Sequence, residues 1–331
     1  MEIALVGSET LIGREIRDLV GTSSPGFELR LIETGETGAA AEEDAPTLPV
    51  ALNAKSLSGA RAVFLAGTPE ANQKAIQLAE GEIPLIDLSF SAEERPDARL
   101  RAPLVESERP GEDDDTGNAA VHVIAHPAAI GLALFLRRLQ MHDEIRRSVI
   151  QIFAPASEHG ASGVDELQQQ TISLLSFKNL PRAVFATQAS FNLLARYGDE
   201  APRPLEETEL RIERHLATLL ALPGEGEGAP MPSLRVLQAP VFHGYSFSAW
   251  VEFEGNPGVE AIENGLAAEH IEVRGGEFEP PTNVGHAGQT GIAVGAIAED
   301  RNAPEACWFW LVCDNLRLAA ENAVAVAREM L

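Results

Sequence analysis

Along the first 125 residues, short apolar runs alternate with segments whose apolar residues recur at helical spacing. The helical segment TLIGREIRDLV places Ile12, Ile16 and Leu19 on one face. The apolar runs are EIALVG, FELRLIE, ARAVFLAG and IPLIDLS. This alternation predicts an α/β fold with a doubly wound parallel sheet. The acidic, Gly-rich and Pro-rich stretches GETGAAAEEDAP and ERPGEDDDTGN read as loops.

The pattern changes after a helix predicted over residues 128–140. Long β-rich runs alternate with the helical segments VDELQQQTISLLS and LEETELRIERHLATLL. The β-rich runs are RRSVIQIFAPAS, SLRVLQAPVFHG and FSAWVEFEG. They predict an α+β domain with an open mixed, mostly antiparallel sheet. The alanine-rich last helix, NLRLAAENAVAVAREML, suits packing against another helix or back on the first domain.

Composition narrows the classes of partner. A net charge of −25 would repel phosphate backbones and anionic lipid, so nucleic acid and membrane surfaces are disfavoured. No run reaches the length of a spanning helix and the N-terminus enters a strand at once, so a cytoplasmic protein is expected. The two cysteines, Cys307 and Cys313, share an apolar strand, which favours buried, inert thiols and gives no metal-ligand spacing.

The segment GSETLIG stands where a dinucleotide fingerprint would be. Gly7 fits its tight turn and Gly13 its close helix packing, but Thr10 replaces the middle glycine and Glu9 adds a carboxylate. Glu33 ends the second strand, where an acid can bind the ribose hydroxyls of NAD. Two alternatives stay open: the turn merely begins a sheet, and Glu33 is a solvated acid at the end of an edge strand.

Several ordered segments resemble the aspartate-semialdehyde dehydrogenase family. They are PASEHGASGVDEL, SFNLL, APVFHGYS, PTNVGHAG and CDNLRLAAENAVAVA. The resemblance implies a Rossmann domain at 1–125 completed by the C-terminal helix 314–331, a central dimerisation domain at 126–313, and a homodimer. It also implies reduction of aspartyl phosphate with NADPH through a cysteine thioester.

Positions that carry this chemistry in the family hold other residues here. The resemblance matches Ala128 and Ala129 to the Asn-Cys pair of the nucleophile, Tyr245 to the catalytic His, Gln238 to the substrate Arg, Ala154 to a Gln, Glu209 to a substrate-side Lys, Glu36 to the Arg that reads NADP, and Glu93 to a phosphate-binding Arg, with Arg95 two residues away. This pattern is closest to the Usg-type paralogues that lack the cysteine. It predicts degenerate catalytic positions, disfavours NADP and leaves NAD(H) open, with no cofactor certain.

His126, His159, His243 and Tyr245 are expected on loops facing one cleft, together with Glu158. They could bind a metal or polar ligand, or hydrogen-bond loop backbone; the irregular spacing favours the second reading, and no metal site is predicted. A Ser157–His159 nucleophile pair is disfavoured, because residues two apart on a turn rarely align for proton transfer.

Three hypotheses for the function of the protein follow from the sequence. They are a non-catalytic paralogue acting in binding, regulation or hetero-assembly, an active NAD(P)-dependent oxidoreductase of amino-acid biosynthesis, or a structural partner protein.

Overall fold

The structure is a computed structural model that describes residues 2–23, 26–34, 50–79, 81, 83–106, 121–223 and 228–330. Glu36 and both acidic stretches predicted as loops lie outside the described residues. The chain forms two compact units, one of Met1–Ala125 with Ala319–Leu331 and one of His126–Leu318. The boundary at Ala319 falls inside the last helix, α9 (Asn315–Glu329).

The first unit contains a parallel sheet whose described strands follow the order β3-β2-β1-β4-β5-β7-β6. Its strands are β1 (Glu2–Val6), β2 (Glu28–Glu33), β3 (Val50–Ala51), β4 (Val63–Leu65), β5 (Leu85–Asp87), β6 (Ala98–Arg101) and β7 (Val121–Ile124). Its helices are α1 (Leu11–Ser23), α2 (Ala54–Leu57), α3 (Pro69–Ala79) and α4 (Pro103–Glu106). The order reverses at β1, as in a doubly wound fold, so the predicted fold class is confirmed.

One detail of the predicted sheet is wrong. Glu33 does not end an edge strand, because β3 pairs with β2 through Ile32 and Glu33 and takes the edge. The sequence could not show this, since β3 has two residues and leaves no apolar run to detect.

The second unit contains a mixed sheet in the order β11-β12-β13-β10-β8-β9. Three of its strand pairs are antiparallel and two are parallel, as predicted. Its strands are β8 (Ile145–Ala154), β9 (Ser233–Gln238), β10 (Tyr245–Phe253), β11 (Ile271–Arg274), β12 (Ile292–Glu299) and β13 (Ala306–Cys313). Its helices are α5 (Pro127–His142), the short 3₁₀ helix η2 (Ala156–His159), α6 (Gly160–Leu175), α7 (Leu205–Leu220) and α8 (Val259–Leu266).

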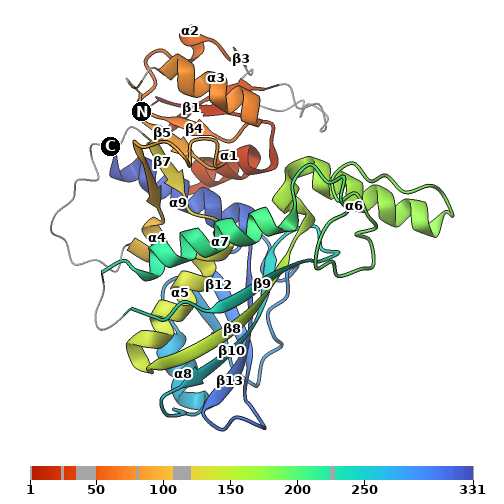
Figure 1. Cartoon of the computed structure of the whole chain (residues 1–331). Coiled ribbons are helices and arrows are strands. Elements are labelled where there is room, and N and C mark those ends of the chain that lie inside the picture. Colours follow the sequence, from red (N-terminus) through yellow and green to blue (C-terminus); the bar gives the residue numbers. More distant parts are fainter. Residues whose placement is uncertain are drawn as a thin grey trace. The chain divides into compact units, whose positions relative to one another are not determined.

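Helices cover one face of this mixed sheet (Figure 1), where α5 contacts α7, α8, β8 and β13. The covered face carries fully buried apolar side chains such as Ile150, Ala249 and Phe309. On the opposite face the alternating residues remain partly exposed, with Val149 at 46% and Trp308 at 44%. The period of two along each strand thus separates a buried face from an open one.

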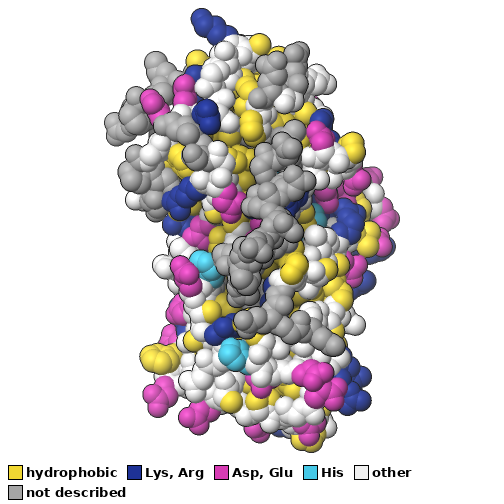
Figure 2. Space-filling model, turned by 90° about the vertical axis from the view of Figure 1, so that its left-hand side faces the viewer, with side chains coloured by type: hydrophobic (Ala, Val, Ile, Leu, Met, Phe, Trp, Pro, Cys, Tyr) yellow, Lys and Arg dark blue, Asp and Glu magenta, His cyan; other side chains and the backbone are white. Residues whose placement is uncertain are grey.

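Acidic side chains occur at several separate places on the face of the molecule shown in Figure 2, among Lys and Arg side chains. On that face the acidic side chains that are drawn in colour do not form one patch. In the described part of the chain, no helix combines the length and apolar character needed to cross a membrane.

Candidate functional site

The first turn of α5 is closed by its own N-cap residue. His126 precedes the helix, and its Nδ1 accepts a hydrogen bond from the backbone N–H of Ala128 at 3.2 Å. Pro127 occupies the first helical position, where its missing N–H costs nothing. The methyl side chains of Ala128 and Ala129 are fully buried. Because Nδ1 accepts, the ring proton of His126 is assigned to Nε2.

That proton points at Glu158. The Nε2 of His126 lies 3.1 Å from Glu158 Oε1, and the hydroxyl of Tyr245 donates to Oε2 at 2.7 Å. The rings of His126 and Tyr245 also pack edge to face, with centroids 5.7 Å apart. Both oxygens of the carboxylate thus have a donor; we call these three residues the Glu158 cluster.

Charge is fixed within this cluster. Burial favours the neutral form of Glu158, but the interactions with His126 and Tyr245 outweigh it and hold the pKa of the carboxyl at about 2. Burial and the nearby carboxylate raise the pKa of the Tyr245 hydroxyl well above its usual value. Tyr245 therefore stays protonated at neutral pH and is a poor general base.

A second set of hydrogen bonds involves Gln238. The hydroxyl of Tyr197 donates to Gln238 Oε1 at 2.7 Å, so His159 Nε2, 2.9 Å from that hydroxyl, is the donor to it. The Gln238 amide donates to the carbonyls of Ala154 and Ala239 at 3.0 and 2.9 Å. Both amide protons of this buried side chain are therefore used within the chain.

Aromatic packing fixes the second set. The rings of His159, Phe185 and Tyr197 meet edge to face in all three pairs, with centroids 5.3 to 5.5 Å apart. Burial lowers the pKa of His159 and raises that of Tyr197. Each shift favours the neutral form, so this set carries no charge at neutral pH.

The sequence expectation for the cleft is therefore only partly met. His126, Glu158 and Tyr245 come together, whereas His159 belongs to the Gln238 set. Half-buried His243 keeps a buried Nδ1 without a hydrogen-bond partner in the described part of the chain. Placing Tyr245 on a loop was wrong, because it is the first residue of β10 and pairs with Cys313.

Ser157 has a partner other than His159. Its hydroxyl and the side chain of Asn315 exchange hydrogen bonds at 3.1 and 3.2 Å, and Asn315 Oδ1 also accepts the N–H of Gly244 at 2.9 Å. Among the described residues, no group of three or more His, Cys, Asp or Glu could hold a metal ion. Sequence reasoning gave no role to Tyr197 or Asn315, although SFNLL ends just before the first and CDNLRL contains the second.

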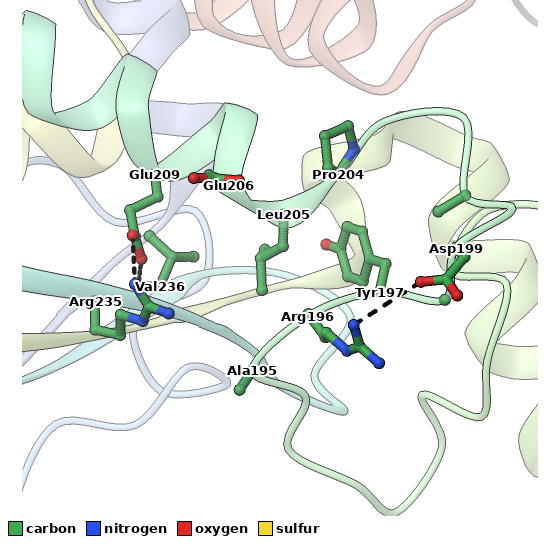
Figure 3. A pocket seen from close by; sticks show the side chains of 12 residues that line it. Ala195, Arg196, Tyr197, Asp199, Pro204, Leu205, Glu206, Glu209, Arg235 and Val236 are labelled. Atoms are coloured by element: carbon green, nitrogen blue, oxygen red, sulfur yellow. Dashed lines mark hydrogen bonds and ion pairs between the residues drawn. The ribbon is translucent and has the colours of Figure 1, made fainter.

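A cavity of about 480 Å³ adjoins the Gln238 set (Figure 3). Tyr197 belongs to both, since it lines the cavity while its hydroxyl binds Gln238. The lining residues come from three places, the 195–201 loop, the start of α7, and β9: Ala195, Arg196, Tyr197, Gly198, Asp199, Ala201, Pro204, Leu205, Glu206, Glu209, Arg235 and Val236. Glu209, matched by resemblance to a substrate-side Lys, is therefore a wall residue here.

Neither cysteine has the properties of a nucleophile. Both side chains are fully buried in β13. Burial raises the pKa of Cys307 to about 11 and raises that of Cys313 further. Cys313 is distant from α5 in sequence but close in space, since a Cβ on Gly131 would lie 3.7 Å from its sulfur. This closeness to α5 does not make Cys313 a nucleophile. The thiolate is the reactive form of cysteine, and the raised pKa keeps the thiol protonated at neutral pH.

The fingerprint region of the first unit is shaped by its two glycines. Gly7 has a φ of +85°, and a Cβ there would lie 2.4 Å from Gly67; a Cβ on Gly13 would lie 2.0 Å from the Gly7 carbonyl oxygen. Thr10 Oγ1 accepts the Gly13 N–H at 3.1 Å. Both glycines are therefore required by backbone packing, with or without a nucleotide.

Two carboxylates flank this turn. Glu9 Oε1 accepts from the backbone N–H and the hydroxyl of Thr34 at 2.6 and 2.7 Å, which joins the turn to the end of β2. Glu33 is exposed at the last position of β2. Elsewhere in this unit, the guanidinium of Arg95 pairs with the carboxylate of Asp97 at 2.8 Å.

Fold and site together define a two-domain α/β protein of the semialdehyde dehydrogenase type. Residues 136–318 match the family model described as semialdehyde dehydrogenase, dimerisation domain. The chain therefore belongs to the semialdehyde dehydrogenase family.

Similar proteins carry two kinds of name. An aspartate-semialdehyde dehydrogenase from Rickettsia bellii is 31% identical over 64% of this chain and 63% of its own length, so the match spans less than two thirds of that relative. A USG-1 protein homolog from Azotobacter vinelandii is 29% identical over 99% of this chain and 96% of its own length. A solved structure of a probable aspartate-semialdehyde dehydrogenase from Pseudomonas aeruginosa superposes with a TM-score of 0.80, at 27% identity, over 100% of this chain and 98% of that one.

Proposed function

We propose that this chain is a non-catalytic member of its family that acts by binding a ligand or a partner, as the Usg-type resemblance suggests. The observation that carries the proposal is the first turn of α5, where buried alanines replace the expected nucleophile and His126 caps the helix. Around it, both oxygens of Glu158 and both amide protons of Gln238 are used internally. These groups have little capacity left for a reacting substrate.

The chain lacks a reactive thiolate for the chemistry that the family resemblance implies. The thioester that the family resemblance implies needs a thiolate, and both cysteines of this chain are buried with raised pKa values. Loss of a nucleophile together with its base commonly lowers the rate by a factor on the order of 10⁶. We therefore expect no turnover above background.

The test is a phosphate-dependent assay of NADP reduction with aspartate semialdehyde, run on the purified wild type and on Ala129→Cys. Both proteins should be inactive, because restoring the thiol leaves Tyr245 and Gln238 engaged in their own hydrogen bonds. Ala128→Cys is a matched control for the burial of a thiol in the same turn. Clear turnover by the wild type would overturn the proposal, and turnover by Ala129→Cys alone would show that the rest of the site is still competent.

A homodimer is part of the same proposal. The open face of the mixed sheet carries Val149 and Trp308. It contains a hollow of about 360 Å³ that is lined mainly by apolar atoms. Arg147 lies over the Trp250 ring, 5.6 Å from its centroid. An exposed apolar face of this kind marks an interaction site, and the matched dimerisation domain supports a second copy as its partner.

A cytoplasmic location belongs to this proposal as well. The two cysteines, which form no disulfide, agree with it.

An NAD-dependent oxidoreductase is the second candidate, and the exposed carboxylate of Glu33 at the end of β2 favours it. Calorimetric titration with NADH and NADPH separates the two functions. Saturable binding of NADH that is lost in Glu33→Gln would support this candidate. Failure of both nucleotides to bind at millimolar concentration would leave the first unit as a scaffold.

A further inference from the structure

We infer that the first unit excludes a dinucleotide cofactor, because side chains of this chain fill the place where its pyrophosphate would lie. The side chains belong to Glu9, Thr10 and Thr34, which follow the carboxyl ends of β1 and β2. The NADPH that the family resemblance implies therefore does not fit the residues present. The inference goes beyond the proposed function, because it concerns cofactor binding by the first unit and not the missing nucleophile of the second.

The order of the parallel strands indicates where a dinucleotide would bind. The chain runs from β1 to β2 and β3 on one side of β1 and returns to β4 on the other side. In a doubly wound sheet, ligands bind in the crevice at the carboxyl ends of the strands where the order reverses. The turn after β1 and the first turn of α1 would then hold the pyrophosphate through backbone N–H groups.

Thr10 closes this crevice. Its hydroxyl oxygen lies 2.8 Å from the carbonyl oxygen of Gly7, after β1, and 2.9 Å from that of Ala66, after β4. The same oxygen accepts the N–H of Gly13, in the first turn of α1, at 3.1 Å. A glycine at this position would leave the crevice open and that N–H free for a phosphate. Thr10 instead joins the two strand ends and consumes the donor.

Glu9 occupies the donors at the end of β2. Its Oε1 accepts the backbone N–H and the hydroxyl of Thr34 at 2.6 and 2.7 Å. Thr34 also covers Gly67, because a Cβ on that glycine would lie 2.8 Å from the Thr34 methyl group. The ends of β1, β2 and β4 are therefore bridged by side chains, and neither donor of Thr34 is available to a ligand.

The charge of Glu9 opposes a phosphate. Its Oε2 is buried and has no hydrogen-bond partner among the residues that the structure describes. A phosphate brings acceptors and negative charge, so it would add repulsion at an oxygen that already lacks a donor. Glu9 precedes α1, whose N-terminus favours negative charge. The carboxylate thus takes the place that a phosphate has in a nucleotide-binding turn.

The experiment is a calorimetric titration of the full-length protein with NADH, comparing wild type with the double variant Glu9→Ala/Thr10→Gly. The two substitutions remove the charge, open the crevice and free the donors that both side chains occupy. The matched control is Glu15→Ala/Thr22→Gly, which makes the same two changes further along α1. Thermal unfolding without nucleotide checks that each variant keeps the fold. If the double variant unfolds, the single variants Glu9→Ala and Thr10→Gly take its place in the same comparison.

The expected result is saturable binding of NADH by the double variant, at least tenfold tighter than by wild type or by the control. The inference is overturned if wild type binds NADH as tightly as the double variant, or if the folded double variant binds no more tightly than the control. The dehydrogenase assay on the same wild-type preparation keeps the two ideas separate. Nucleotide binding without turnover would contradict this inference alone, whereas turnover would contradict the proposed function.

Discussion

Glu158 shows how a buried charge can be kept in an apolar surrounding. Taking a carboxylate out of water is costly unless donors replace the water. His126 and Tyr245 supply one donor to each oxygen, and both donors are buried themselves. Removing any member of the Glu158 cluster would leave a buried polar group without a partner, which costs more than the hydrogen bond itself contributes.

This arrangement predicts an acid-dependent stability. The pKa of Glu158 is about 2 in the folded protein and ordinarily 4.5, so its contribution is complete above pH 4.5 and is lost as the pH falls toward 2. The contribution is at most about 3 kcal/mol. Urea unfolding at a series of pH values should show wild type losing stability below pH 4.5 faster than Glu158→Gln. Parallel profiles for the two proteins would contradict this account.

His159 predicts a second pH effect in a different window. Burial lowers its pKa below the ordinary 6.5, so the unfolded chain binds the proton more readily than the folded protein near that pH. Stability should therefore fall as the pH is lowered through 6.5. His159→Gln, which can still donate to Tyr197, should lack this part of the dependence when melting temperatures are compared between pH 7.5 and 5.5. An unchanged slope in the variant would mean that other histidines cause it.

The thiols offer a third test at this scale. Both cysteines are buried and both have raised pKa values, so neither presents a thiolate at neutral pH. We expect a thiol reagent to label native protein at least a hundredfold more slowly than protein unfolded in urea, measured by mass spectrometry. Rapid labelling of Cys313 in the native state would show that it is accessible and would reopen it as a candidate nucleophile.

At the scale of elements, α6 fixes the loop that follows it. Glu166 accepts the backbone N–H groups of Val184 and Phe185 at 2.6 and 3.1 Å. Gln170 accepts those of Ala189 and Ser190 at 2.8 and 3.2 Å. These side chains take the place that a partner strand would have, so the irregular segment holds Phe185 in the ring packing that supports Tyr197.

Gln170→Ala should therefore destabilise the protein by about 2 to 4 kcal/mol, because it leaves several buried backbone groups unpaired. Gln169→Ala, one residue away and exposed, is the control and should be nearly neutral. Denaturant unfolding measures the difference. Hydrogen exchange at Ala189 and Ser190 should also accelerate in the first variant alone; equal effects of the two substitutions would count against this role of α6.

The same segment illustrates what a sequence pattern can predict. Apolar periodicity predicted both sheets and α7, because burial on one face imposes a period of two or 3.6 residues. The run Gln168–Gln170 gives no sign that the last glutamine is buried, since its partners lie up to twenty residues further along the chain. The start of α6 at Gly160, four residues before the predicted helix, could not be predicted either, because GASG contains two glycines and has poor helix propensity.

For the site, the resemblance pointed to positions in the chain but not to the hydrogen bonds that join them. It placed Tyr245 and Gln238 in one reactive centre, whereas the structure assigns them to two separate sets of hydrogen bonds. Which donor meets which acceptor depends on side-chain direction in the folded chain. Apolar periodicity and motif matching do not give that direction.

At the scale of the whole molecule, the open sheet face predicts the state of assembly. Trp308→Glu would place a charge within the proposed dimer surface and should yield monomers in sedimentation velocity at micromolar concentration. Val284→Glu is the control, because Val284 is 88% exposed and lies outside the sheet. A dimer that persists in Trp308→Glu, or wild type that is monomeric, would exclude this face as the interface.

The edges of the mixed sheet differ from its face in chemical character. β9 and β11 are the outermost strands. Arg235 of β9 forms an ion pair with Glu209 of α7, and Arg274 forms one with Glu272 within β11. Charged side chains on an edge oppose the addition of a further strand from another molecule. Self-association through the face can therefore stop at a closed pair of subunits, while growth into open-ended β aggregates is opposed at both edges.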